Sequence, residues 1–285
     1  MATVYLNGKY VAKGEAMISV DDRGFVFGDG IYEVVRVVEG RIFAWDAHAA
    51  RMANGLGELR IDARGADSAT LRAVCEKLVA DDGLTTGEAT VYLQVTRGAS
   101  MRVHHFPPAG TKPTVYAAAS PFKPNFAMRE EGAKGITYPD VRWARCDLKT
   151  VNLLGAVLAR QAAAEAGAYE AIYHRDGIIT EGAATNAFMV VGGVLRSHPL
   201  SNYILHGITR AVIVELAAEL NIPLDERPVS LLELPQVDEL FVCGTTTDVQ
   251  PIVVLDGKPV GNGKPGPVTV RLREALAARL YGTGK

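Results

Sequence analysis

The chain has 285 residues and a formal net charge of -2, with 48% hydrophobic and 22% charged residues. A charge balance this close to neutral gives no basic field, so we expect no nucleic-acid partner. No apolar run approaches the roughly 20 residues that a membrane-spanning helix needs, and we expect no membrane partner. The first residues lack the charged and apolar regions of a signal peptide. These features are typical of a globular enzyme.

Three cysteines, Cys75, Cys146 and Cys243, are too few and too far apart for a disulfide framework. No Cys-x-x-Cys pair is present, and His104-His105 has no third ligand spaced nearby, so we predict no metal site. Unpaired cysteines favour a reducing compartment, which predicts a cytoplasmic protein.

Residues 1–120 predict a small N-terminal α+β domain. Asn7-Gly8 separates two short strand patterns and is a strong hairpin signal. Asp46 precedes a helical pattern that runs to Leu59, and its side chain is the expected N-cap. The remaining patterns predict a strand at 31–38, a helix around 71–79, strands at 89–97 and 114–119, and a loop at 98–108.

Residues 121–126 include Pro121 and Pro124 in a polar stretch that disfavours a helix, and they predict an interdomain linker. The large C-terminal domain is expected at 127–285. Its patterns predict extended structure at 135–149, helices at 153–167, from 207 and at 268–281, hairpins around 175–177 and 192–193, and a strand at 240–243. Helices interspersed with antiparallel hairpins predict the α+β class rather than a strict βαβ alternation.

Gly28-x-Gly30 has the spacing that begins a dinucleotide-binding motif. However, Glu33 stands where the third glycine belongs, and a strand pattern follows where a helix is required. The sequence therefore excludes a dinucleotide site here.

Lys149 and Glu181 are the two residues whose chemistry stands out. Lys149 ends a largely extended segment, where burial would lower its pKa and favour Schiff-base chemistry. Taken alone, each residue is more often an exposed side chain in water. Three anion-binding signals accompany them: a helix start at Ile208-Thr209, the hydroxyl-rich turn with Thr245 and Thr246, and Arg51.

The chain resembles the fold-type IV family of pyridoxal-phosphate enzymes over essentially its whole length. The resemblance rests on Asp22-Arg23-Gly24-Phe25-x-Phe27-Gly28-Asp29-Gly30-Ile31-Tyr32-Glu33 and on Arg145-Cys146-Asp147-Leu148-Lys149-x-x-Asn152-Leu153-Leu154-Gly155. Thr180-Glu181-Gly182 and Gly207-Ile208-Thr209-Arg210 add to it. Within this family the similarity is greatest to the D-amino acid aminotransferases. It implies two domains with the cofactor site between them, the lysine being carried by the C-terminal domain.

The resemblance implies a role for each matching residue. Lys149 would form the Schiff base with pyridoxal 5'-phosphate and move protons, and Glu181 would pair with the pyridinium nitrogen. The phosphate would be held by Arg51, the backbone of Ile208 and Thr209, and Thr245 or Thr246. Ala183-Ala184-Thr185 stands where D-amino acid members commonly carry serines, a departure that removes a possible hydroxyl contact to the cofactor.

Arg102-Val103-His104 matches the Arg-x-His pair that D-amino acid aminotransferases use, with a tyrosine matching Tyr32, to bind the substrate carboxylate. A guanidinium, an imidazole and a phenol are convergent donors for a carboxylate. The alternative is that both side chains only decorate a mobile loop. In those relatives the loop crosses a dimer interface, so a homodimer is implied.

The expected activity is transfer of an amino group from a D-amino acid such as D-alanine to a 2-oxo acid such as 2-oxoglutarate, with ping-pong kinetics. Alternatives of the same fold are an (R)-amine transaminase, a branched-chain L-aminotransferase and an aminodeoxychorismate lyase. A protein that stores the cofactor without turnover is a further alternative.

Overall fold

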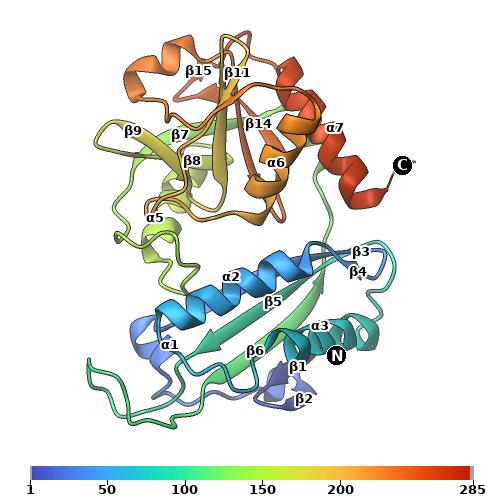
Figure 1. The fold of residues 1–285 in the computed structure, drawn as a ribbon, viewed down its shortest axis with the longest axis vertical. Helices are drawn as coiled ribbons and strands as arrows, with labels where there is room; N and C mark the ends of the chain where they lie inside the picture. Colours follow the sequence, from blue (N-terminus) through green and yellow to red (C-terminus); the bar gives the residue numbers. More distant parts are fainter. Residues whose placement is uncertain (1, 283–285) are drawn as a thin grey trace. The chain divides into compact units, whose positions relative to one another are not determined.

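The computed structural model describes residues 2–282 and divides into two compact units. Unit 1 comprises Met1–Lys123 and Leu148–Asn152, and unit 2 comprises Pro124–Asp147 and Leu153–Lys285. Both contain helices and antiparallel strands, which confirms the predicted α+β class (Figure 1). Among residues 2–282, no helix combines the length and the apolar character that crossing a bilayer requires.

Unit 1 is built on a six-stranded sheet with the order β2-β1-β6-β5-β3-β4. The strands are β1 (Thr3–Leu6), β2 (Lys9–Ala12), β3 (Gly30–Val38), β4 (Arg41–Ile42), β5 (Glu88–Thr96) and β6 (Thr114–Pro121). The hairpin between β1 and β2 is confirmed: Asn7 and Gly8 both have positive φ, as a two-residue turn matched to strand twist requires.

Helices α2 (Trp45–Glu58) and α3 (Ser68–Asp81) cover one face of this sheet (Figure 1). Their apolar residues join alternate residues of β3, β5 and β6 in one core. A Cβ at Gly55 of α2 would lie 3.3 Å from the Ile31 side chain, so the glycine allows helix and strand to approach closely. The 3₁₀ turn η1 (Lys13–Glu15) and helix α1 (Arg23–Phe27) complete the unit.

Unit 2 is built on a nine-stranded sheet with the order β12-β11-β10-β13-β14-β7-β8-β9, and β15 also pairs with β14. The strands are β7 (Ala133–Pro139), β8 (Glu170–Arg175), β9 (Ile178–Gly182), β10 (Asn186–Val191), β11 (Val194–Arg196), β12 (Leu224–Asp225), β13 (Glu239–Gly244), β14 (Asp248–Leu255) and β15 (Lys258–Pro259). The predicted hairpins β8–β9 and β10–β11 are confirmed.

The helices of unit 2 lie on two sides of its sheet. Helices α6 (Ile208–Glu219) and α7 (Pro267–Tyr281) pack against each other and against β13, whereas α5 (Leu154–Glu165) packs against β7 and β8 (Figure 1). The short α4 (Phe126–Glu131) contacts β14, and the 3₁₀ helix η2 (Leu231–Gln236) precedes β13. Phe188 and Phe241 stack on neighbouring strands with ring centroids 5.2 Å apart and fix the centre of the sheet.

The structure corrects several local predictions. Asp46 is not the N-cap of α2: Ala44 takes that position in a left-handed conformation, and Asp46 lies in the first turn. Helix α1 was not predicted, although Asp22 caps it through the Gly24 N–H. The extended structure predicted for 135–149 ends at Pro139, because β7 leaves its parallel partner β8 there.

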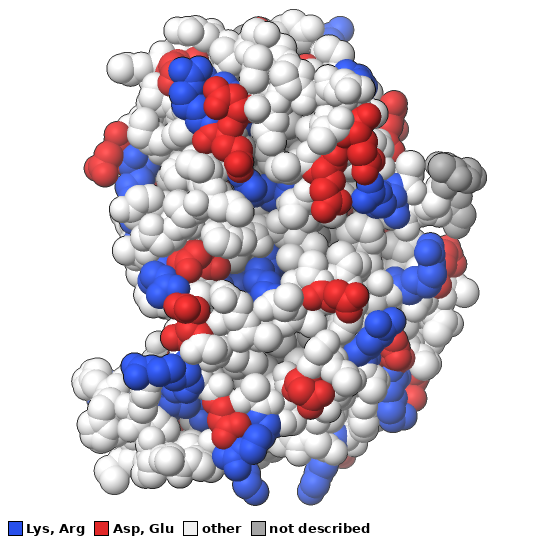
Figure 2. Space-filling view, in the orientation of Figure 1, with Lys and Arg blue, Asp and Glu red and all other residues white. Residues whose placement is uncertain are grey.

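The predicted division of the chain differs from the observed one in the placement of residues 148–152. Pro121 still belongs to β6 and Phe126 begins α4, but residues 122–125 of the predicted linker lie in no helix or strand, and the chain passes from unit 1 to unit 2 between Lys123 and Pro124. Lys149 lies in unit 1, not in the C-terminal unit as predicted, because residues 148–152 pair with β3. On the face drawn in Figure 2, Lys and Arg are interspersed with Asp and Glu, in keeping with the near-neutral net charge.

Candidate active site

The predicted site residues fall into both units. Lys149 and Tyr32, together with Arg51, Arg102 and His104, belong to unit 1. Glu181 and the predicted phosphate-binding residues of the C-terminal half belong to unit 2, and these are Ile208, Thr209, Thr245 and Thr246.

Lys149 is fixed to β3 by backbone hydrogen bonds at its own carbonyl and at Val151, two residues later. The Tyr32 N–H donates to the Lys149 carbonyl at 3.0 Å, and the Val151 N–H donates to the Gly30 carbonyl at 3.0 Å. The Lys149 Nζ atom lies 4.1 Å from the centroid of the Tyr32 ring. The half-buried amine therefore rests on the face of the Tyr32 phenol.

Tyr32 begins a row of three tyrosines on the sheet. Tyr92 stacks on Tyr32 with centroids 5.7 Å apart, and Tyr116 follows at 6.3 Å. Since side chains alternate along a strand, this row lies on the face opposite Val91 and Leu93, which enter the core with α2 and α3. Burial raises the pKa of Tyr92 to about 12, so its hydroxyl stays a neutral donor and bonds Gln94 at 2.6 Å.

Arg51 is held by a buried carboxylate. Its Nε and Nη2 donate to the two oxygens of Glu33, each at 2.7 Å, and Nδ1 of His48 lies 2.8 Å from Glu33 Oε2. Burial by itself would raise the pKa of Glu33, but the bonds from Arg51 and His48 lower it to about 2. Glu33 is therefore ionised and orients the guanidinium that was predicted to bind phosphate. That role remains a prediction.

Arg102 and His104 lie beside Phe27 of α1. The Arg102 guanidinium is 5.3 Å from the Phe27 centroid, and the His104 ring is 5.6 Å away. Both side chains are exposed. Among residues 2–282, no hydrogen bond, ion pair or ring contact joins either of them to Tyr32. Within one chain the predicted carboxylate-binding trio is therefore not assembled.

The base of this loop is held by an ionic cluster that the sequence did not reveal. Arg23 and Arg97 both donate to Asp29, at 2.8 and 2.7 Å from their Nε atoms. Arg23 also donates from Nη1 to the Val103 carbonyl at 2.7 Å. Because Val103 lies between Arg102 and His104, this bond fixes the backbone that carries both side chains.

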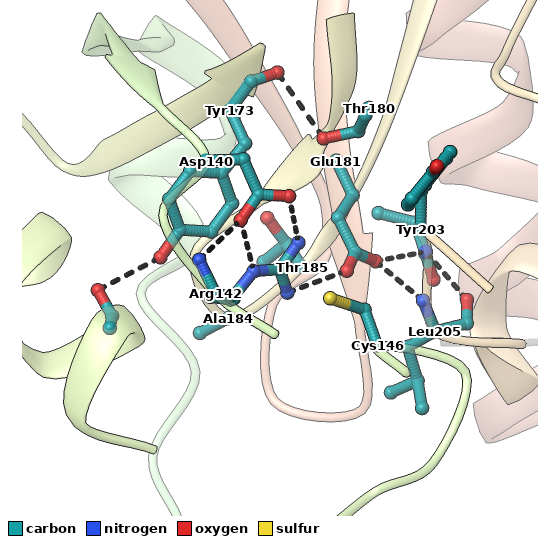
Figure 3. A network of polar contacts seen from close by, with 12 residues as sticks. Asp140, Arg142, Cys146, Tyr173, Thr180, Glu181, Ala184, Thr185, Tyr203 and Leu205 are labelled. Carbon is teal, nitrogen blue, oxygen red and sulfur yellow. Dashed lines mark hydrogen bonds and ion pairs between the residues drawn. The ribbon is translucent and has the colours of Figure 1, made fainter. Parts of the chain in front are cut away.

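Glu181 occupies the centre of a buried polar network in unit 2 (Figure 3). Its Oε1 accepts from Arg142 Nη1 at 2.8 Å, and its Oε2 accepts from the Leu205 N–H at 2.9 Å and from Asn186 at 3.0 Å. Arg142 in turn donates to Asp140, at 2.9 Å from its Nε. The carboxylate is thereby held in one orientation by three donors.

Burial raises the pKa of Glu181 to about 7, although Arg142 beside it opposes that change. The side chain is only 3% exposed. A carboxylate in such a place stabilises a nearby cation more than one in water does, because the local dielectric is low. The arrangement suits a partner that carries a proton on a ring nitrogen.

The start of α6 lies next to the Glu181 network. Gly207 is the N-cap and makes no side-chain cap hydrogen bond, so Ile208 and Thr209 occupy a first turn that no side chain caps. A Cβ at Gly207 would lie 1.9 Å from Asn186 Oδ1, so this glycine lets the amide that holds Glu181 pack against the helix start. Backbone N–H groups at such a start favour an anion.

Thr245 and Thr246 lie in the turn from β13 to β14, which the Thr247 N–H closes onto the Gly244 carbonyl at 3.1 Å. An ideal Cβ on Gly244 would lie 3.8 Å from the Ala184 carbonyl, so this turn is adjacent to Ala183-Ala184-Thr185. The Thr185 hydroxyl donates to Glu170 at 3.0 Å. The Thr185 hydroxyl in the segment 183–185 is thus already bonded to another residue of the protein.

The sequence did not reveal the residues that orient Arg51 and Glu181 through hydrogen bonds. Glu33 and His48 form the network around Arg51, and Arg142 and Asn186 bond Glu181. Asn186 carried a usable signal, because it follows Glu181 by five residues across a tight turn. Arg142 carried none, since it lies 39 residues from Glu181.

Comparison with known proteins identifies a family. Residues 30–255 match the family model described as "Amino-transferase class IV". The D-alanine aminotransferase of Staphylococcus aureus (strain COL) is 40% identical over 276 residues, which are 97% of each chain. The D-alanine aminotransferase of Bacillus licheniformis is 38% identical over 273 residues, 96% of this chain and 95% of that one.

Solved structures show the same fold. The branched-chain amino acid aminotransferase of Escherichia coli superposes with a TM-score of 0.92 at 28% identity, over 99% of this chain and 96% of that chain. The T.th. branched-chain amino acid aminotransferase, complexed with N-(5'-phosphopyridoxyl)-L-glutamate, superposes with a TM-score of 0.88 at 28% identity, over 99% and 95%.

Proposed function

Because this chain belongs to the class IV aminotransferases, we propose that it is a pyridoxal-phosphate-dependent transaminase that moves the amino group of a D-amino acid to a 2-oxo acid. The relatives' substrate suggests D-alanine as donor. The observation that carries the proposal is the anchoring of Lys149 on β3, with its amine 4.1 Å from the Tyr32 ring centre.

Pyridoxal phosphate, when bound, supplies an aldehyde for the amino group and a ring that accepts electrons from the substrate Cα. The Lys149 amine would move the proton at Cα, and its fixed backbone holds Nζ in place for this. Glu181 would keep the ring nitrogen protonated. Both half-reactions use the same lysine, so ping-pong kinetics are expected.

Each of the groups proposed to hold the phosphate suits an anion by its chemistry. Arg51 supplies a guanidinium, already oriented by Glu33, and Ile208 and Thr209 supply N–H groups at a helix start. Thr245 and Thr246 supply hydroxyls from the β13–β14 turn. Because Ala184 lacks a hydroxyl and that of Thr185 bonds Glu170, we expect no side-chain contact to the cofactor from this segment.

We further propose a homodimer. Arg102 and His104 do not meet Tyr32 within one chain, so a partner's loop would complete the carboxylate-binding trio. Helix α5 supports association, because Leu154, Val157 and Leu158 expose an apolar surface at helical spacing. The cytoplasmic location is also a proposal, supported by three free and buried cysteines.

A branched-chain L-aminotransferase is the second candidate, because solved enzymes of that kind share the fold. An (R)-amine transaminase and an aminodeoxychorismate lyase use the same fold and are tested alongside. The Arg102-Val103-His104 segment favours the D-amino acid reading over the (R)-amine transaminase, whose substrate has no α-carboxylate, and over the lyase, since it matches the Arg-x-His pair of the D-amino acid aminotransferases. A branched-chain L-amino acid carries an α-carboxylate as well, so the two aminotransferase readings are separated by the stereochemistry of the accepted donor.

The test is a visible absorbance scan of the purified enzyme with pyridoxal phosphate, with D-alanine, L-leucine and 1-phenylethylamine added in separate cuvettes. We expect D-alanine alone to remove the visible band of the bound cofactor. Lys149→Ala should abolish turnover by at least about 10⁴-fold, whereas Lys134→Ala, an exposed lysine on β7, should not. Loss of the band with L-leucine and not with D-alanine would establish the second candidate instead.

A further inference from the structure

Unit 1 contains a cavity that none of the functions above uses. It has a volume of about 390 Å³ and lies between α2, the 61–68 segment and the start of α3. Tyr32, Arg51 and Lys149 are not among its lining residues. It is therefore separate from the predicted cofactor-binding residues of this unit.

The walls of the cavity are mostly apolar. Met52, Leu56, Ile61 and Leu93 are buried side chains that line it. The Trp45 indole N–H, also in the wall, already donates to the Ser68 hydroxyl at 3.1 Å. The volume exceeds the roughly 150 Å³ of an engineered apolar cavity that binds benzene, so it has room for one or two aromatic rings.

Glu33, His48, Asp67 and Ser68 bring polar groups to this wall. The Glu33 oxygens bond Arg51 and His48, and the Asp67 oxygens accept from Thr70, so His48 is the polar side chain that remains to be considered. The side chain is 2% exposed and lines the cavity, and its Nδ1 faces Glu33 at 2.8 Å. No residue between 2 and 282 bonds its Nε2. Because Glu33 is ionised and accepts only, Nδ1 carries the proton, and Nε2 of the neutral ring is left as an acceptor.

The ring is kept neutral by its surroundings. Burial lowers the pKa of His48, against the opposing effect of Glu33. A ligand carrying charge would lose its hydration among apolar side chains, whereas a neutral ring with one donor would satisfy Nε2. Exposed Ala53 and Ala63 line the cavity as well, so it opens to solvent.

We propose that this cavity is a second small-molecule site, which binds a neutral aromatic compound bearing one N–H or O–H donor, such as a phenol or an indole. The donor bonds Nε2 of His48, and the ring packs between Met52, Leu56 and Leu93. Since Glu33 contacts both His48 and Arg51, an occupant bonded to His48 is linked to the guanidinium through three successive hydrogen bonds.

The test measures binding of 4-fluorophenol and of fluorobenzene to the holoenzyme by fluorine NMR. We expect one saturable site, with the phenol binding about fivefold more tightly because of the added hydrogen bond. The Nε2 nitrogen resonance of His48 should shift with 4-fluorophenol and not with fluorobenzene.

Two variants locate the site. Ala53→Phe at the rim and Ala49→Leu inside both fill the cavity from α2 and should weaken 4-fluorophenol binding at least tenfold. Ala50→Phe places the same ring on the same helix at an exposed position outside the lining and should leave binding unchanged. Absence of saturable binding, equal affinity for the two probes, or undiminished binding to both filling variants would overturn the proposal.

Discussion

Arg142 Nη1 lies 2.8 Å from Glu181 Oε1, and this buried pair determines how the carboxylate ionises. Burial alone favours the neutral acid, whereas the guanidinium favours the anion, and the result is a pKa of about 7. Asp140 binds the same guanidinium and shares its charge. Glu181 therefore titrates in the physiological range. A further positive charge beside it would favour the ionised carboxylate and lower this pKa.

The raised pKa of Glu181 makes folding depend on pH. The free energy that this group contributes is fully present below its unfolded pKa of 4.5 and is lost as the pH rises through 7. The loss is roughly 3 kcal/mol, at 1.36 kcal/mol per unit. In urea unfolding of the cofactor-free protein between pH 4.5 and 8, Glu181→Gln should show a correspondingly flatter profile.

The control for this profile is Glu274→Gln, an exposed glutamate on α7 whose profile should match the wild type. Parallel profiles for the wild type and Glu181→Gln would show that the buried carboxyl does not titrate in this range.

Glu33→Gln should destabilise unit 1, because it leaves the Arg51 charge buried without its carboxylate. Breaking a buried ion pair costs about 3–5 kcal/mol at neutral pH. With its pKa lowered to about 2, the Glu33 contribution is present above pH 4.5 and is lost as the pH falls toward 2. Urea unfolding at pH 7 measures the cost.

The double variant Glu33→Gln with Arg51→Met should be more stable than Glu33→Gln alone, since it also removes the guanidinium charge that Glu33 balances. Glu76→Gln breaks the exposed Arg72–Glu76 pair and serves as the matched control, with little change expected. A double variant less stable than the single one would disprove this account of Arg51.

Arg102→Met should raise KM for D-alanine by about 10- to 100-fold, because a charge-assisted bond to the carboxylate is lost. Any residual activity toward 1-phenylethylamine, which has no carboxylate, should be unaffected. The adjacent His105→Asn serves as the control and should change neither. Steady-state kinetics with D-alanine and with 1-phenylethylamine test this prediction. An equal loss of activity toward both amines would show that Arg102 only supports the structure of the loop.

Gly98→Ala should destabilise the base of the Arg102 loop far more than Gly110→Ala. Both glycines have φ near +90°, so an alanine meets similar backbone strain at each. A Cβ at Gly98 would lie 1.9 Å from the Lys112 carbonyl oxygen, whereas one at Gly110 meets nothing within 4 Å. We expect a difference of about 1–3 kcal/mol in unfolding free energy, and equal effects would contradict the structure.

Turns and helices of this fold could be predicted from the sequence where a short sequence pattern specifies them. Asn7-Gly8 and Asp176-Gly177 form the expected two-residue turns, and the helical spacing of residues 71–79 lies within α3. Asp46 is not the cap because Ala44 adopts a left-handed conformation and becomes the N-cap two residues earlier. Propensity cannot specify that conformation for an alanine.

The sequence by itself determined which residues carry the chemistry, since Lys149 and Glu181 stand in long ordered motifs. Only the tertiary structure decided what surrounds them: the ring of Tyr32 under Lys149, the Arg142 charge against Glu181, and the carboxylate that orients Arg51. Periodicity and turn chemistry act between near neighbours in the chain. Burial and ion pairing join residues far apart in it, and they exist only once the sheets and helices have packed.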